Sequence, residues 1–131
     1  MSLGVLVVDD SDYMRVHVAS ALDESQFEVV AEAENGAEAV EQFKRHGDAV
    51  DLVMMDIVMR KANGVKAAAA ISELDPETRI IMCTSVGQKK KMKLAAKAGA
   101  DGYIIKPFDE TDVADAVADV FGEDVLAGGA R

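Results

Sequence analysis

The chain alternates short apolar runs with longer segments in which apolar residues recur every three or four positions. The apolar runs, which are rich in branched side chains, are Val5–Val8, Phe27–Ala31, Leu52–Met55, Ile80–Cys83 and Tyr103–Ile105. All but the second are apolar almost throughout, which is typical of parallel strands covered on both faces. The alternation predicts an α/β fold in which a parallel sheet lies between two layers of helices.

Capping residues mark where the helices begin and end. Ser11 or Asp12 can cap the first helix, and Asn35 followed by Glu38 resembles a capping box for the second. Glycines that suit helix ends stand at Gly47 and Gly99. We expect the third, fourth and fifth helices at residues 64–74, 88–98 and 110–121. Together with the apolar runs these helices complete five βα units.

Length and composition narrow the classes of protein. The 131 residues fit one domain, which we expect at residues 1–124, followed at 125–131 by a flexible tail or the start of a linker. No segment approaches the roughly 18 consecutive apolar residues of a membrane helix, so we expect a cytoplasmic protein without membrane insertion. The net charge of −10 argues against nucleic acid as a partner. The single cysteine, Cys83, excludes a disulfide framework and a thiolate metal site.

Polar side chains stand where four of the five apolar runs end. They are Asp9, Asp10, Asp56, Thr84 and Lys106. Because parallel strands end at one edge of a sheet, we expect these side chains to converge. Three neighbouring carboxylates need a counter-charge, and oxygen ligands without a His or Cys cluster favour Mg²⁺ before Ca²⁺. A carboxylate nucleophile, a metal, an ammonium group and a hydroxyl are the groups that phosphoryl transfer requires.

Four motifs carry a family resemblance. Val7–Ser11, Met55–Met59, Thr84–Ser85 and Lys106–Phe108, in this order and spacing, closely resemble the receiver domains of two-component response regulators, especially the CheY-like regulators of chemotaxis. The resemblance covers essentially the whole chain. It implies a (βα)₅ flavodoxin-like three-layer sandwich whose parallel strands stand in the order 2-1-3-4-5.

The same resemblance implies a role for each residue of the predicted site. Asp56 would be the phosphoacceptor, and Asp9, Asp10, Asp56 and the main-chain carbonyl of Val58 would arrange the Mg²⁺ shell. Lys106 would pair with Asp56 or with its phosphoryl group, and the peptide bond after Lys106 would be cis. The chain would then catalyse only its own phosphorylation and dephosphorylation, so we do not expect an enzyme with a separate substrate.

The resemblance also implies a switch and partners. Thr84 and Tyr103 would form the switch pair, and a histidine kinase of the CheA-like kind would supply the phosphoryl group. The fourth helix, the last strand and the last helix would present a surface to a downstream target such as a flagellar motor switch or an adaptor, from a monomer. Lys89, Lys93 and Lys97 form a stripe at helical spacing, which is either a solvated helix face or a docking surface for an acidic partner.

Other functions remain open at this point. A phosphohydrolase that uses an aspartate nucleophile would carry an Asp-x-Asp pair, but Val58 stands at its second position, and a flavin carrier would have a Ser/Thr/Gly loop where this chain has Asp9–Asp12. The chain can also be the receiver portion of a larger regulator with an output domain. Two departures from the family pattern, Arg60 in place of proline and Asn63 before Gly64, put the rigidity and metal affinity of their loop in doubt.

The lifetime of the phosphorylated form is a first testable prediction. The positions two past Asp56 and two past Thr84, which tune hydrolysis in the family, are Val58 and Val86. Neither side chain can orient a water molecule, so the acyl phosphate should outlive that of relatives with polar residues there. A time course of the purified phosphoprotein measures this directly, and a half-life of only seconds would contradict the expectation.

Overall fold

The computed structural model describes residues 2–59 and 64–122 of the chain. Strands and α-helices alternate along these residues, with one short 3₁₀ helix, η1 (Gly47–Ala49), after the second helix. The strands are β1 (Leu3–Val8), β2 (Phe27–Ala33), β3 (Leu52–Asp56), β4 (Arg79–Thr84) and β5 (Gly102–Ile105). The helices are α1 (Asp12–Ser20), α2 (Gly36–His46), α3 (Gly64–Leu74), α4 (Lys89–Ala98) and α5 (Glu110–Phe121).

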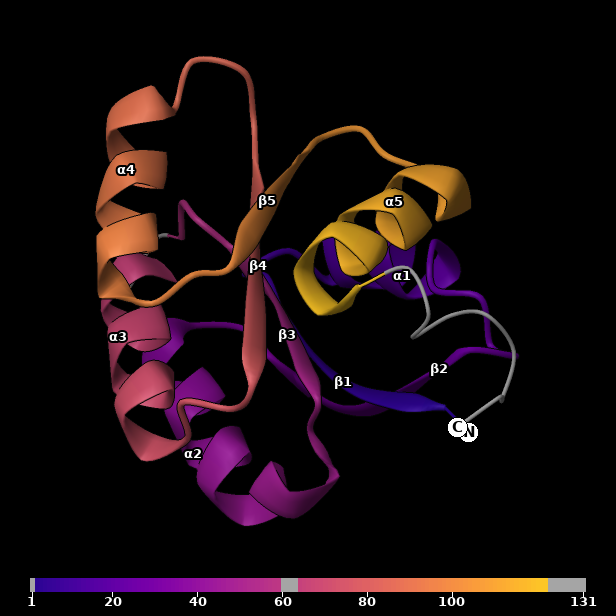
Figure 1. Cartoon of the computed structure of the whole chain (residues 1–131), viewed down its shortest axis with the longest axis horizontal. Coiled ribbons are helices and arrows are strands. Elements are labelled where there is room, and N and C mark those ends of the chain that lie inside the picture. Colours follow the sequence, from indigo (N-terminus) through magenta and orange to yellow (C-terminus); the bar gives the residue numbers. More distant parts are fainter. Residues whose placement is uncertain (1, 60–63, 123–131) are drawn as a thin grey trace.

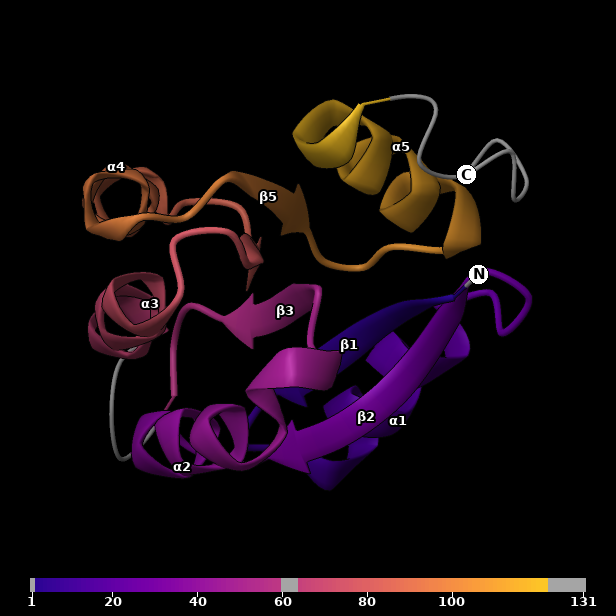
Figure 2. The same ribbon diagram turned by 60° about the horizontal axis from the view of Figure 1, so that its bottom comes forward.

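The strands form one parallel sheet in the order β2-β1-β3-β4-β5. Helices α2, α3 and α4 lie along one face, and α1 and α5 lie on the other (Figures 1 and 2). This arrangement confirms the predicted three-layer sandwich and its strand order. The connection after β1 leads to α1 on one face and the connection after β3 leads to α3 on the other (Figure 2), so the crevice between the ends of β1 and β3 is where an open α/β sheet binds its ligands.

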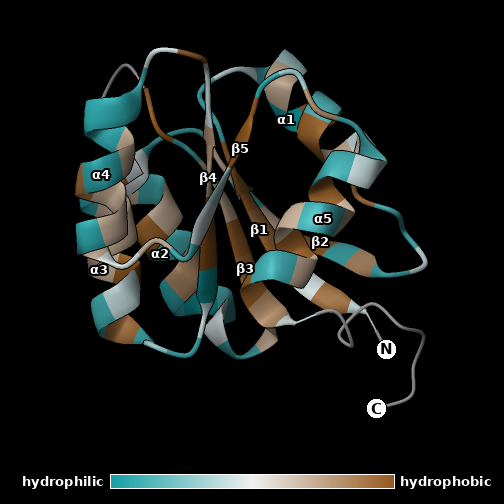
Figure 3. Cartoon of the chain, turned by 45° about the horizontal axis from the view of Figure 1, so that its top comes forward, coloured by the Kyte–Doolittle hydropathy of each residue, from teal (hydrophilic) through white to brown (hydrophobic). Residues whose placement is uncertain are grey.

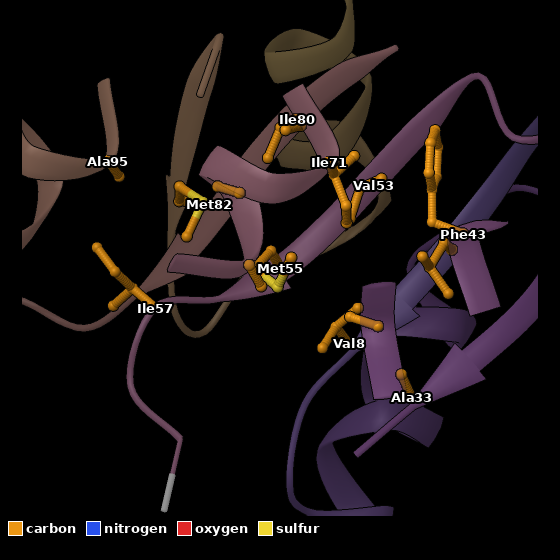
Figure 4. Packing of buried hydrophobic residues seen from close by; sticks show 14 of the residues in the cluster. Val8, Ala33, Phe43, Val53, Met55, Ile57, Ile71, Ile80, Met82 and Ala95 are labelled. Carbon is orange, nitrogen blue, oxygen red and sulfur yellow. The ribbon is translucent and has the colours of Figure 1, made fainter. Parts of the chain in front are cut away.

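Each face of the sheet has its own hydrophobic core. On one side Phe43 of α2, Ile71 of α3 and Ala95 of α4 pack with Met55 and other strand side chains (Figure 4). On the other side α1 and the turn after it contribute Val18, Ala21 and Leu22, and α5 contributes Val113 and Val117. Colouring by hydropathy shows hydrophobic strands at the centre of the molecule and hydrophilic segments on the outer helix surfaces (Figure 3). Burial on both faces explains why the strands are apolar throughout.

Strand register aligns the residues that matter for the site. Val8 pairs with Met55, so Asp9 and Asp10 follow β1 beside the end of β3. Asp56 pairs with Cys83, one residue before Thr84. The register therefore brings the carboxyl ends of three strands to one edge.

The predicted helix caps are largely confirmed. Ser11 caps α1 by accepting from the Met14 N–H at 3.2 Å. Asn35 caps α2 by accepting from the Glu38 N–H at 2.8 Å. The reciprocal half of the predicted capping box is different, because the Glu38 carboxylate accepts from the N–H of Glu34, one residue before the cap.

The two glycines predicted at helix ends behave differently. Gly99 follows α4 with φ of 119°, the left-handed conformation that glycine adopts without steric cost. Gly47 keeps a right-handed φ of −49° and continues directly into η1. A glycine after a helical pattern thus marks a chain reversal in one case and only a tightening of the helix in the other.

Two further expectations concern composition. Cys83 is buried and unpaired, as predicted, and burial raises the pKa of its thiol to about 12. Among residues 2–59 and 64–122, no helix has both the length and the hydrophobicity to cross a bilayer. The predicted tail at 125–131 lies outside the described residues.

Candidate functional site

Three carboxylates gather where β1 and β3 end. Oxygen atoms of Asp9, Asp10 and Asp56 all lie within 4.8 Å of one another. Asp9 and Asp56 are nearly inaccessible, with exposed fractions of 2% and 6%, while Asp10 is half-buried. The structure therefore brings together the acidic residues that the sequence placed at strand ends.

Lys106 supplies the counter-charge. Its Nζ donates to Asp9 Oδ2 at 3.2 Å and to Asp56 Oδ1 at 3.3 Å. The residue follows β5, where its N–H donates to the Thr84 carbonyl at 2.7 Å, and the peptide bond between Lys106 and Pro107 is cis, as expected. One ammonium group thus bridges carboxylates from two different strands.

Main-chain N–H groups hydrogen-bond to two of the three carboxylates. The Ser11 N–H donates to Asp9 Oδ1 at 3.0 Å, and the Val58 N–H donates to Asp56 Oδ1 at 3.3 Å. The first residue of α3, Gly64, approaches so closely that an added Cβ would lie 2.3 Å from the Asp56 carbonyl oxygen. Only glycine fits this place without displacing the main chain of Asp56.

Burial and charge shift the protonation of the site. Burial raises the pKa of Asp56 above its ordinary value, helped by Asp9 and opposed by Lys106. Burial also works to lower the pKa of Lys106, but Asp56 and Asp9 outweigh it and raise that pKa. Lys106 is therefore held in its charged form, but its charge does not fully offset the cost of ionising buried Asp56.

The donor set fits a hard divalent cation. It contains carboxylate oxygens and no sulfur or imidazole, and oxygen ligands are what Mg²⁺ and Ca²⁺ prefer. With all three aspartates ionised, one ammonium group leaves two negative charges in a partly dehydrated place, which a divalent ion would neutralise. Within residues 2–59 and 64–122, this cluster can therefore hold a metal ion.

The predicted switch residues lie on the two strands beyond β3, with Thr84 at the end of β4 and Tyr103 within β5. Thr84 is buried, with an exposed fraction of 1%, and its hydroxyl donates to the Ser85 carbonyl at 3.2 Å. Tyr103 is 56% exposed on β5. The hydroxyl is thus engaged with its own loop in this structure, and the role of the pair stays a prediction.

One residue of the site was not predicted from the sequence. Arg15 of α1 donates through Nη1 to the Asp9 carbonyl at 2.7 Å and through Nε to Glu32 Oε1 at 3.2 Å, and it also pairs with Asp12. Its side chain is only 13% exposed. A basic residue three positions after an acidic one is typical of an exposed helix pair, so nothing in the sequence pattern indicates that Arg15 turns inward. Arg60 and Asn63, the two departures, lie outside the described residues.

Comparisons with known proteins agree with this geometry. The family model described as the response regulator receiver domain matches residues 5–118. The chain is 54% identical over 120 residues to the chemotaxis protein CheY of Halobacterium salinarum, covering 92% of this chain and 98% of that protein. It is 44% identical over 117 residues to the chemotaxis protein CheY of Bacillus subtilis, covering 89% and 96% of the two chains.

A solved structure shares the whole architecture. The chain superposes on a structure from Borrelia burgdorferi, a CheX–CheY complex with BeF₃ and Mg²⁺, with a TM-score of 0.83 and 33% identity. The match covers 91% of this chain and 89% of that one. Likeness in sequence and in fold thus point to one family over nearly the full length.

The electrostatics of the site predict that Asp56→Asn stabilises the metal-free protein at neutral pH. A pKa raised above 3.8 means that folded Asp56 binds its proton more tightly than the unfolded chain does. Its contribution to stability is therefore present below about 3.8 and is lost as pH rises through the raised pKa. Urea unfolding without divalent cations should show a gain of about 1 kcal/mol near neutral pH.

The gain should disappear in acid, where Asp56 is protonated in both states of the wild-type protein. Saturating Mg²⁺ should reverse it, because the wild-type site then gains a ligand that the variant lacks. A variant that is no more stable than the wild type at neutral pH would show that Lys106 already compensates the ionised carboxylate.

Proposed function

The chain belongs to the response regulator receiver domain family, as a homologue of the chemotaxis protein CheY, and we propose that Asp56 is the phosphoacceptor of this two-component regulator. The observation that carries the proposal is the pairing of buried Asp56 with Lys106 beside two further carboxylates. Carboxylates act as covalent nucleophiles, and an adjacent ammonium group can stabilise the charge of the incoming phosphoryl group.

The hydrogen bonds to Asp56 favour one of its oxygens for attack. Both bonds that its carboxylate accepts from described residues, from Val58 and Lys106, end on Oδ1. Among residues 2–59 and 64–122, Oδ2 accepts none. Raised basicity of the carboxylate also makes it a better nucleophile once it is ionised. Oδ2 is therefore the oxygen that we expect to receive phosphorus.

The donor would be a phosphohistidine of a histidine kinase of the CheA-like kind. An Asp56 oxygen forms a bond to phosphorus while the phosphorus–nitrogen bond breaks, and its electron pair returns to the imidazole ring of the kinase. Lys106 can follow the developing charge, because its Nζ already lies 3.3 Å from Asp56. The product is an acyl phosphate on this chain, so the chain turns over no separate substrate and is a switch rather than an enzyme.

Mg²⁺ is the cation that we propose for the site. It would neutralise phosphoryl oxygens during transfer. Asp9, Asp10, Asp56 and the main-chain carbonyl of Val58 would arrange its shell, and the Borrelia burgdorferi relative was solved with BeF₃ and Mg²⁺. Val58 is 45% exposed and Asp10 is half-buried, so this side of the cluster is not closed off from solvent.

The output surface would be formed by α4, β5 and α5. Tyr103 and Ile105 of β5 are exposed apolar residues. The lysine stripe Lys89, Lys93 and Lys97 lies on α4, and Asp112, Asp115 and Asp119 of α5 line a groove of about 390 Å³ beside β5. Such a surface, basic on one side and acidic on the other, suits a polar protein partner with an apolar centre.

Phosphorylation would change this surface through Thr84 and Tyr103. A phosphoryl group on Asp56 would attract the Thr84 hydroxyl away from the Ser85 carbonyl, and the exposed Tyr103 ring would then turn inward. A group that interacts with only one arrangement must shift the population toward it. The target would be a cytoplasmic motility protein, such as a flagellar motor switch or an adaptor, which binds the monomer.

The proposed function predicts one phosphoryl adduct. The wild-type protein is incubated with a small-molecule acyl phosphate and Mg²⁺, and its intact mass is measured before and after hydroxylamine. We expect one labile phosphoryl group, which Asp56→Asn abolishes because the nucleophile is gone.

Asp48→Asn is the matched control, since Asp48 is an exposed aspartate in η1, outside the site. This variant should be phosphorylated like the wild type. An adduct that survives in Asp56→Asn, or one that never forms in the wild type, would refute the assignment of Asp56.

A further inference from the structure

Arg15 makes contacts that reach the acidic site without touching the place where a cation would bind. Its guanidinium donates to the main-chain carbonyl of Asp9, to the carboxylate of Glu32 at the end of β2, and to Asp12 in the first turn of α1. The side chain is 13% exposed, although arginine usually reaches into solvent. A buried fork of donors that joins three separate segments restrains their relative positions.

The carbonyl that Arg15 holds belongs to the peptide unit between Asp9 and Asp10. Its orientation fixes the direction in which the chain leaves Asp9 and, with it, where the Asp10 side chain starts. The other side of Asp9 is held as well, because its N–H donates to the Ala33 carbonyl at 3.1 Å. Residues at the end of β2 thus restrain both sides of Asp9, one directly and one through Arg15.

We propose that Arg15 is a positioning residue for the divalent cation site, which sets the Asp9–Asp10 peptide so that both carboxylates face Asp56. The inference rests on the proposed cation site and adds a residue to it. Partners of this kind, which orient metal ligands from outside, typically change metal affinity by 10-fold to 100-fold when they are removed. Arg15 thereby links the edge strand β2 to the geometry of the site.

The sign of the change in Mg²⁺ affinity separates this role from a general effect of charge. Removing a cation from the neighbourhood of three carboxylates makes the potential there more negative, so charge alone predicts tighter Mg²⁺ binding in Arg15→Gln. Loss of positioning predicts weaker binding instead. Arg15→Lys keeps the charge but not the planar fork of donors, so positioning predicts that lysine does not restore the affinity.

The test is a calorimetric titration of Mg²⁺ into each folded protein at constant ionic strength. We expect Arg15→Gln and Arg15→Lys to bind Mg²⁺ roughly tenfold more weakly than the wild type. Arg45→Gln is the matched control, because Arg45 on α2 makes an exposed pair with Glu41 at 3.5 Å. It should leave the affinity unchanged.

A second control separates positioning from lost stability. Val117→Ala truncates a buried side chain of α5, so it should lower the urea midpoint without changing Mg²⁺ affinity. Arg15→Gln that binds Mg²⁺ as tightly as the wild type, or more tightly, would overturn the proposal, and so would full affinity in Arg15→Lys. If Arg15→Gln does not fold, Arg15→Lys decides alone. The titration of the wild-type protein tests the cation site itself, because a wild-type protein that binds no Mg²⁺ would refute that site.

Discussion

The structure depends on holding three carboxylates together against their mutual repulsion at the ends of β1 and β3. Their oxygens lie within 4.8 Å of one another, two of the side chains are almost inaccessible to solvent, and a single ammonium group bridges Asp9 and Asp56. Such a cluster is unfavourable by itself, because each ionised carboxylate raises the free energy of the next. The same excess of negative charge favours the binding of a cation. The bound cation would in turn supply the positive charge that a phosphoryl group needs. The cluster therefore lowers the stability of the fold while it supplies the function, which is common at functional sites.

The rest of the molecule keeps that cluster from relaxing. The sheet packs against a separate hydrophobic core on each face, so the strand ends cannot move apart without opening one of the two cores. Main-chain contacts add local restraint: Ser11 and Val58 donate to the carboxylates, and Gly64 brings α3 against the Asp56 carbonyl. A site preorganised in this way does not have to rearrange when charge arrives, which lowers the barrier for transfer.

Much of this was predictable because strongly periodic patterns and strand-end residues carry their own physical meaning. The five strands and the bounds of α3 and α5 follow the periodic pattern, and the strand order follows the family resemblance. The polar residues at the ends of β1, β3 and β5 converge as expected. The features that were not predicted depend on contacts between residues, and a sequence pattern does not show such contacts. Glu38 bonds to Glu34 rather than closing a capping box, and Arg15 turns inward to the Asp9 carbonyl and to Glu32, 17 positions away on β2. The orientation of the Thr84 hydroxyl is likewise set by its loop and not by its position in the motif.

If the acidic cluster is a divalent cation site whose ligands belong to the folded state, Mg²⁺ must stabilise the folded protein. Urea unfolding with and without Mg²⁺ at constant ionic strength tests this most directly. Mg²⁺ at one hundred times its Kd should raise the free energy of unfolding by about 2.7 kcal/mol, and Asp10→Asn should remove most of that gain. Equal stability with and without Mg²⁺ would show that the acidic cluster of the folded protein does not bind this ion.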